Sequence, residues 1–312
     1  MQLWIDTDTA SDDAVALLMA FRWPNVDVLG VSVVAGNVPP QQGARNALYV
    51  AELCGVDVPV YLGAEKPLLR PYVHAAWFHG EDGLSDKGYA PTKLIPQTEH
   101  AVPALIAATR AHPGLTLVTL GPLTNIALAV QQAPDIAEKI GRVVIMGGAA
   151  ATNGNVTPAA EYNIWVDPEA ARMVFHSGLP ITMVGWEFCQ GEFVLSFDEI
   201  AQVRAIHTPY SDFTLDCNET AIEAYHVQTG EHGLSLPDAV AMAATLDPTV
   251  ILRSSRHYVD VETQSELTRG MTVVDKLNVA HDERNRAVWQ QLLGRGAPNV
   301  EVCWELDAAR WK

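Results

Sequence analysis

The feature that most constrains the fold is an alternation of short apolar runs with longer segments of helical period over the first two-thirds of the chain. Short runs that are apolar throughout are typical of buried parallel strands, and parallel strands need a crossover connection, usually a helix. The alternation predicts an α/β fold, with a mostly parallel, Rossmann-like open sheet that carries helices on both faces. The predicted strands are Leu3–Ile5, Val26–Val34, Val58–Tyr61, Leu115–Leu120, Arg142–Met146 and Ile181–Val184, and the predicted helices are Asp12–Phe21, Gln41–Leu53, Val102–Ala111, Thr124–Gln131 and Pro168–His176.

From about residue 190 the pattern becomes more helical and less regular. We expect helices over Ile222–Gln228 and Asp238–Ala244, followed by a final strand pairing around Val259–Val274. Since no segment has the composition of a linker, the sequence predicts one domain over residues 1–312 with a helical or irregular C-terminal cap.

The charge balance limits the classes of partner. Against 20 Lys and Arg stand 37 Asp and Glu, a net charge of −17, which repels phosphate backbones and anionic lipid. The N-terminal segment lacks the basic region of a signal peptide, and no apolar run reaches the roughly 18 residues of a membrane span. We therefore expect a cytoplasmic protein whose partner is a small molecule, with no nucleic acid and no membrane. The four cysteines lie far apart without a CxxC pair, which argues against a zinc site or a disulfide framework.

An acidic run follows the first predicted strand, where the ligand crevice of an open α/β sheet lies. It reads Asp6-Thr7-Asp8-Thr9-Ala10-Ser11-Asp12-Asp13. Four carboxylates so close together repel one another unless a cation neutralises them, and Ca²⁺ prefers an all-oxygen set of this kind. Two other interpretations are helix capping and an Asp-x-Asp phosphatase that uses Mg²⁺; Ala10 stands where that phosphatase pattern usually has Thr or Val.

Further polar motifs follow other predicted strands or lie in loops. They are Val34-Ala35-Gly36-Asn37, the loop Trp77-Phe78-His79-Gly80-Glu81-Asp82-Gly83, Leu120-Gly121-Pro122-Leu123-Thr124-Asn125, and the segment from Gly154 to Pro168 with Asn155, Glu161 and Asn163. With the acidic run and in this order, they resemble the inosine/uridine-preferring nucleoside hydrolases, a family of Ca²⁺-dependent N-ribohydrolases. The resemblance extends over about Leu3 to Asp275.

The resemblance implies a role for each matching residue. Ca²⁺ would be held by Asp8, Asp13, the carbonyl of Leu120 and Asp238, and Asp8 would also take a proton from the attacking water. Residues that would contact the sugar are Asp12, Asn37, Asn155, Glu161, Asn163 and Asp238, with His79 as a further substrate-binding candidate. Carboxylate and amide oxygens suit a reaction that passes through an oxocarbenium-like ribose, because they stabilise positive charge on the ring.

The chain departs from the family pattern next to the late aspartate. Inosine/uridine-type members carry a histidine there, associated with protonation of the departing base, whereas this chain has Pro237. Proline cannot donate a proton, so the departing base must be activated in another way. The candidates for contact with the base are Tyr225, His226, Gln228 and His232, or, by aromatic stacking, Trp77, Phe78 and Trp186.

The favoured function is hydrolysis of the N-glycosidic bond of free ribonucleosides, as part of nucleoside catabolism or purine and pyrimidine salvage. A nucleoside- or sugar-binding protein with weak turnover is the main alternative, since Pro237 removes a family feature. By analogy with the family we expect a homo-oligomer, either a dimer or a tetramer.

Overall fold

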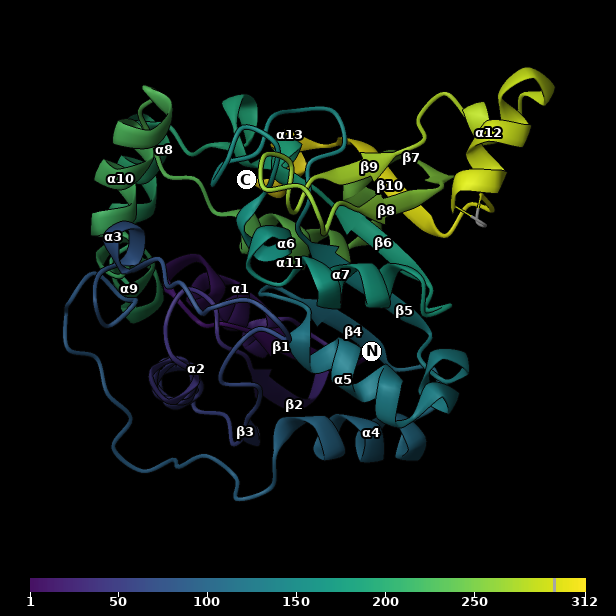
Figure 1. Cartoon of the computed structure of the whole chain (residues 1–312). Coiled ribbons are helices and arrows are strands. Elements are labelled where there is room, and N and C mark those ends of the chain that lie inside the picture. The colour runs from purple at the N-terminus through teal and green to yellow at the C-terminus, as the bar shows by residue number, and fades with distance from the viewer. Residues whose placement is uncertain (294–295) are drawn as a thin grey trace.

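The computed structural model describes residues 1–293 and 296–312. An eight-stranded sheet crosses the molecule in the order β3-β2-β1-β4-β5-β6-β10-β7 (Figure 1). Neighbouring strands are parallel throughout, except for the antiparallel pair β10 and β7 at one edge. The strands are β1 (Gln2–Thr7), β2 (Asp27–Val33), β3 (Val60–Leu62), β4 (Thr116–Thr119), β5 (Arg142–Met146), β6 (Ile181–Val184), β7 (Ile251–His257) and β10 (Val300–Leu306). The predicted fold class is therefore confirmed.

The six predicted strands of the first two-thirds correspond to β1 to β6. The expected pairing around Val259–Val274 forms as a separate antiparallel ribbon of β8 (Val259–Val261) and β9 (Thr272–Val274). It is not the final pairing, because β7 and β10 join the main sheet. In β7 only the last residue, His257, is buried, and β10 mixes buried with half-buried and exposed residues, so both sequences lack the continuous apolar run on which the prediction relied.

Helices cover both faces of the sheet. On one face lie α1 (Ser11–Arg22), α2 (Pro40–Cys54) and α11 (Pro237–Leu246), and on the other lie α4 (Ala101–Ala111), α5 (Thr124–Gln132) and α7 (Pro168–Phe175). Side chains of β1 alternate between the two buried layers: Leu3 and Ile5 belong to one apolar cluster and Trp4 to the other. Each layer is thus a core formed by one face of the sheet and the apolar sides of its helices.

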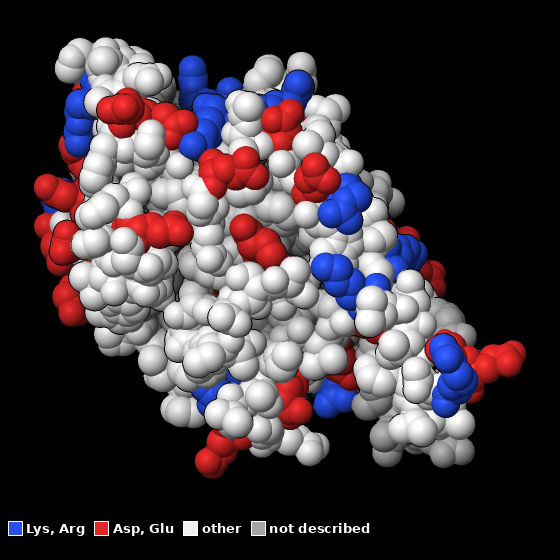
Figure 2. All heavy atoms as spheres, turned by 90° about the horizontal axis from the view of Figure 1, so that it is seen from above, with Lys and Arg blue, Asp and Glu red and all other residues white. Residues whose placement is uncertain are grey.

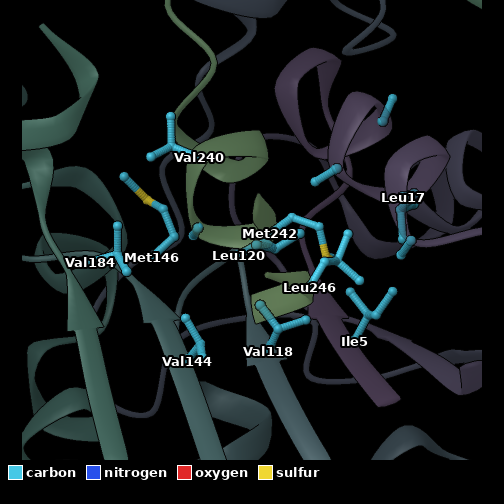
Figure 3. Close-up of a cluster of buried hydrophobic side chains, with 14 of the residues drawn as sticks. Ile5, Leu17, Val118, Leu120, Val144, Met146, Val184, Val240, Met242 and Leu246 are labelled. Carbon is cyan, nitrogen blue, oxygen red and sulfur yellow. The ribbon is translucent and has the colours of Figure 1, made fainter. Parts of the chain in front are cut away.

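Figure 3 shows the core beneath α11. Ile5, Val118 and Val144 come from three neighbouring strands, and Met242 and Leu246 of α11 pack in the same cluster. Since every residue from Asp238 to Leu246 is buried, α11 is fixed by apolar contact along its length. That packing holds the N-terminus of α11, with Asp238, at the same end of the sheet as the acidic run.

Most of the remaining helices lie after residue 190, in the part that was predicted to be helical or irregular. The remaining helices are α3 (Ala76–His79), α6 (Tyr162–Val166), α8 (Phe197–Arg204), α9 (Pro209–Asp216), α10 (Glu219–Thr229), α12 (Glu283–Leu293) and α13 (Ala308–Trp311). Helices α3, α8, α9 and α10 gather at one side of the molecule (Figure 1). Among the described residues, none of the helices has both the length and the apolar character needed to cross a membrane.

The strand order places a topological switch between β1 and β4. The chain winds from β1 to β2 and β3 on one side, and β4, β5 and β6 continue on the other. At such a point the connections that leave two neighbouring strands diverge, which opens a crevice beyond their C-terminal ends. The turns that follow β1 and β4 border this crevice.

Candidate active site

Asp8 lies directly after β1, at the base of the crevice, and is completely buried. Its Oδ2 accepts a hydrogen bond from the backbone N–H of Asn37 at 2.6 Å, while its Oδ1 has no hydrogen-bond partner. Two glycines enclose the carboxylate: a Cβ at Gly36 would lie 2.0 Å from Oδ2, and one at Gly121 would lie 2.7 Å from Oδ1. Any larger residue at either position would displace the carboxylate.

Three further carboxylates meet beside Asp8. Oxygen atoms of Asp12, Asp13 and Asp238 lie within 4.8 Å of one another, and all three residues are buried. Asp12 and Asp13 occupy the first turn of α1, and Asp238 occupies the first turn of α11. The two helix N-termini therefore point at the same place, and their backbone dipoles favour negative charge there.

Local hydrogen bonds orient Asp13. Its Oδ1 accepts from the Thr7 hydroxyl at 2.5 Å, and its Oδ2 accepts from the backbone N–H of Ala10 at 2.9 Å. The side-chain amide of Asn37 also reaches Oδ2, at 3.5 Å. Asp13 thus links Thr7 at the end of β1 to Ala10 at the start of α1. These hydrogen bonds keep the turn compact and bring its carboxylates together.

The cluster carries more negative charge than its neighbours can balance. Burial, and then the neighbouring Asp13, raise the pKa of Asp8 well above its usual range, and burial together with Asp13, Asp12 and Asp8 does the same to the pKa of Asp238. Burial raises the pKa of Asp12 and that of Asp13 to about 6. Among the described residues no Lys or Arg forms a salt bridge with these four groups.

His79 is the one histidine beside the cluster among the described residues. Its Nδ1 lies 2.8 Å from the Ser11 hydroxyl and 3.8 Å from Oδ1 of Asp12. Burial lowers the pKa of His79 to about 4, so the ring is neutral at pH 7 and does not supply the missing positive charge.

A divalent cation fits the cluster. The Oδ1 atoms of Asp8 and Asp12 are buried without a hydrogen-bond partner, which is costly unless something else binds them. The available donors are oxygens only, the ligand type that Ca²⁺ and Mg²⁺ prefer. Cys189 and Cys217 are buried thiols whose pKa is raised by burial, so they do not add thiolate ligands.

The segment after β5 brings a second group of polar side chains to the crevice. Glu161 caps α6 by accepting from the backbone N–H groups of Asn163 at 2.8 Å and Ile164 at 3.2 Å, and its Oε2 also accepts from Gly148 N–H at 2.9 Å. Burial raises the pKa of Glu161 to about 7. The amide of Asn163 donates to the carbonyl of Leu120 at 2.7 Å, which joins this segment to the turn after β4.

A pocket opens above these groups. The predicted residues in its lining are Asp12, Asn37, Trp77, Phe78, His79, Leu120, Asn155, Glu161, Asn163, Trp186, Gln228 and Asp238. Asp8 and Asp13 lie beneath the lining, where they contact Asn37. One cavity thus brings together residues from the ends of β1, β4 and β5 and from α3, α6, α10 and α11. The sequence alone could place these residues only near one edge of the sheet.

Three of the predicted base contacts lie away from the pocket lining. Tyr225 is buried and its hydroxyl donates to Glu231 at 2.7 Å. The rings of His226 and His232 stack on each other with centroids 3.9 Å apart. Of that group only Gln228 reaches the pocket, with its Nε2 donating to the Asn155 carbonyl at 2.9 Å. Successive residues of a helix point in different directions, so a segment prediction could not separate Gln228 from its neighbours.

Other lining residues were not predicted: Val73, His74, Ala75, Met146, Val156, Tyr162, Trp165, Ser235 and Pro237. Tyr162 and Trp165 could have been found, because they stand three residues apart beside Asn163 and therefore share a face of α6. The Tyr162 hydroxyl donates to the Val73 carbonyl at 3.0 Å and so holds the segment before α3 against α6. Nothing in the sequence marks Val73 or His74 in advance.

The surface seen from above Figure 1 carries charges of both signs. In Figure 2, Lys and Arg side chains lie among Asp and Glu side chains, and much of the face is formed by uncharged residues. The buried carboxylates of the crevice are thus a concentration of negative charge apart from the mixed charges of this face.

A sequence profile described as inosine-uridine preferring nucleoside hydrolase matches residues 3–312. The match extends past the segment of resemblance that we identified, Leu3 to Asp275, because β10 and the C-terminal residues are part of the same fold.

Relatives and solved structures of similar fold agree with this match. The chain is 36% identical to a pyrimidine-specific ribonucleoside hydrolase, RihB, of Escherichia coli, over 91% of this chain and 90% of that protein. A purine-preferring ribonucleoside hydrolase from Gardnerella vaginalis superimposes with a TM-score of 0.88 at 31% identity, covering 100% of this chain and 95% of that one. The plant nucleoside hydrolase PpNRh1 superimposes with a TM-score of 0.90 at 29% identity, covering 99% and 96%.

Proposed function

The chain belongs to the inosine-uridine preferring nucleoside hydrolase family and hydrolyses the N-glycosidic bond of ribonucleosides, and from this premise we propose that it does so with Ca²⁺ held at the crevice. The observation that carries the proposal is the set of buried carboxylates Asp8, Asp12, Asp13 and Asp238, which have no Lys or Arg salt-bridge partner among the described residues. A buried concentration of negative charge without a cation would oppose folding.

The residues that would hold the ion are Asp8, Asp13, the Leu120 carbonyl and Asp238. They come from the turn after β1, the turn after β4 and the N-terminus of α11. When bound, Ca²⁺ orients the ribose diol and lowers the pKa of a coordinated water. Oxygen ligands with no nearby thiolate favour this hard cation over zinc.

The sugar would lie between the acidic cluster and α6. Asp12 and Asn37 line the pocket on the α1 side, and Asn155, Glu161 and Asn163 line it on the α6 side. Groups on both sides can accept or donate hydrogen bonds to ribose hydroxyls, and the carboxylates stabilise the positive charge that develops on the ring.

Asp8 would act as the general base. Its Oδ2 is fixed by the Asn37 N–H, whereas its Oδ1 is free of protein partners. A carboxylate held by one oxygen keeps a defined direction while the other oxygen accepts the proton of a water molecule.

The departing base would be stabilised by the upper walls of the pocket. Trp77, Phe78 and Trp186 offer aromatic faces, and Gln228 offers an amide. Pro237 stands at the first position of α11 and lines the pocket, so no proton can come from that position. Stacking then replaces a dedicated acid in assisting departure of the base.

At the level of the whole protein we propose one domain over residues 1–312, a cytoplasmic location and a homo-oligomer, either a dimer or a tetramer. The charge balance and the family resemblance support these statements. Light scattering on the purified protein tests the oligomeric state directly.

The proposed function is tested by ribose release from a panel of substrates. Inosine, adenosine, guanosine, uridine, cytidine and p-nitrophenyl riboside are incubated with EDTA-treated protein, with and without added Ca²⁺. We expect release that depends on Ca²⁺, with p-nitrophenyl riboside as a good substrate because its leaving group needs little protonation. Release that is unaffected by EDTA would remove the metal from the proposal. Tight nucleoside binding without release would instead support the binding-protein alternative.

A further inference from the structure

Asp6 is a buried carboxylate for which the proposed reaction has no use. It lies in β1, opposite Ser32 of β2 and Thr119 of β4 in the sheet register, and it is completely buried. Its Oδ2 accepts hydrogen bonds from the Ser32 hydroxyl and from Nδ2 of Asn125, the latter at 2.8 Å. A carboxylate buried in the centre of a sheet is costly, so its retention calls for a specific reason.

The backbone and the side chain of Asp6 contact the same turn. The Leu120 N–H donates to the Asp6 carbonyl at 2.8 Å, and Asn125, five residues later, donates to the Asp6 carboxylate. One residue of β1 therefore holds both ends of the turn that follows β4. The Leu120 carbonyl, which is the proposed metal ligand of this turn, accepts from the Asn163 amide at 2.7 Å.

A hydrogen bond from the backbone fixes the orientation of the Asn125 amide. Its Oδ1 accepts from the backbone N–H of Ala64 at 2.8 Å, so Nδ2 must be the atom that faces Asp6. Gly63 packs against the same amide, since a Cβ there would lie 2.3 Å from Oδ1. The Asn125 amide is therefore fixed: Ala64 holds its Oδ1, and its Nδ2 donates to Asp6.

We propose that Asp6 is a positioning residue for the metal site, which holds the turn 120–125 against the end of β1 so that the Leu120 carbonyl and Asp8 face one cation. The inference rests on the proposed calcium site. It assigns Asp6 no contact with the ion or the substrate: Oδ2 accepts from Ser32 and Asn125, Oδ1 is buried without a protein partner, and Asp6 does not line the pocket.

The test is the affinity for Ca²⁺ of metal-free Asp6→Asn protein, measured by isothermal titration calorimetry without substrate. Removing a partner that orients a metal ligand typically costs about 10- to 100-fold in affinity, and we expect a loss in this range. The exchange Asp6→Asn with Asn125→Asp should recover most of it, because the amide introduced in β1 can then donate to the carboxylate introduced in α5, which still accepts from the Ala64 N–H. If Asp6→Asn does not fold, Asn125→Ala is measured in its place.

Asp275→Asn is the matched control. Asp275 is also a buried carboxylate, but it accepts from the backbone N–H groups of Val279 and Ala280, at 2.8 and 3.0 Å, outside the pocket lining. We expect its Ca²⁺ affinity to equal that of the unmodified protein. Wild-type affinity in Asp6→Asn, an equal loss in the control, or no recovery in the exchange would overturn the inference. If the unmodified protein itself binds no Ca²⁺, the proposed calcium site fails first, and the inference fails with it.

Discussion

At the scale of single residues, the site depends on glycines as much as on carboxylates. A Cβ at Gly36 would overlap Oδ2 of Asp8, at 2.0 Å, so Gly36→Ala must push the carboxylate out of place. We expect Gly36→Ala to lower kcat/KM by about 100-fold or more, the typical loss when a general base no longer acts. Steady-state kinetics with p-nitrophenyl riboside measures this.

Gly178→Ala is the matched control for that prediction. Gly178 has φ +84°, and a Cβ at this position would meet no atom within 4 Å, so alanine there costs about 1 kcal/mol of stability through backbone strain alone. Its kcat/KM should remain near the unmodified value. Equal activity in the two variants would show that the close approach to Asp8 is unimportant.

Asp8→Asn tests the base itself. Asparagine keeps an oxygen that can accept from the Asn37 N–H, so the turn should stay folded, but it cannot take a proton from water. We expect turnover to fall by at least about 10²-fold, with an unchanged circular dichroism spectrum. Near-normal turnover would show that Asp8 is not the base.

The residues that could be predicted are those that belong to short motifs. Asp8, Asp13, Asn37 and Glu161 each stand in a polar run that follows a strand, and the structure brings them to one crevice. His74 and Val73 could not be predicted, because their segment has neither period nor motif and reaches the pocket only through a tertiary contact with Tyr162.

At the scale of elements, Asp167 connects α7 to two neighbouring segments. It is the N-cap of α7 and accepts from the Ala170 N–H at 3.1 Å. It also accepts from the Leu68 N–H at 2.8 Å and the Thr124 hydroxyl at 2.7 Å, so it joins α7 to the segment after β3 and to α5.

Asp167→Ala removes all three bonds and leaves buried donors unpaired. We expect a loss of about 2 kcal/mol or more in the free energy of unfolding, measured by urea titration. Asp307→Ala is a suitable comparison, because Asp307 caps the short C-terminal helix α13 through one bond to Arg310 and is half-buried. Its loss should be below about 1 kcal/mol. An Asp167→Ala loss as small as this would show that the contacts to α5 and the β3 loop contribute little.

Strands β1, β4, β5 and β6 could be predicted because they are buried along most of their length, which demands continuous apolar runs, and the end of β2 is buried in the same way. Strands β7 and β10 could not, because they are the antiparallel pair at the edge of the sheet and carry polar residues such as Arg253 and Glu305 on one side. Helices α8 and α9 were also missed. Helix α8 contains no fully buried residue, and only Ile200 and Val203 pack against a core cluster, so its apolar stripe is short.

At the scale of the whole molecule, the stability of the metal-free protein should fall as the pH rises, while the stabilisation by added metal should grow. Burial raises the pKa of Asp12 and Asp13 to about 6 and that of Asp6 and Glu161 to about 7, whereas carboxyl groups of an unfolded chain titrate near 4. Between about pH 4 and 7 the folded metal-free chain therefore binds more protons, and its stability falls as the pH rises through that range. The lowered pKa of His79, about 4, opposes this trend, but the raised pKa values of Asp8 and Asp238 add to it.

We expect EDTA-treated protein to melt several degrees higher at pH 5 than at pH 8. Added Ca²⁺ should raise the melting temperature more at pH 8 than at pH 5, because its carboxylate ligands are then deprotonated. Thermal melts over this range, followed by circular dichroism, measure both effects. A metal-free melting temperature that climbs steadily from pH 5 to pH 8 would contradict the assignment of these buried carboxylates.

The most direct measurement of the central claim is anomalous diffraction from crystals grown with Ca²⁺ and soaked with a slowly cleaved ribonucleoside analogue. The account predicts one strong anomalous peak between Asp13 and Asp238, with the ribose hydroxyls facing it and the base among the aromatic side chains. An acidic cluster without such a peak, or a ribose bound elsewhere, would contradict it.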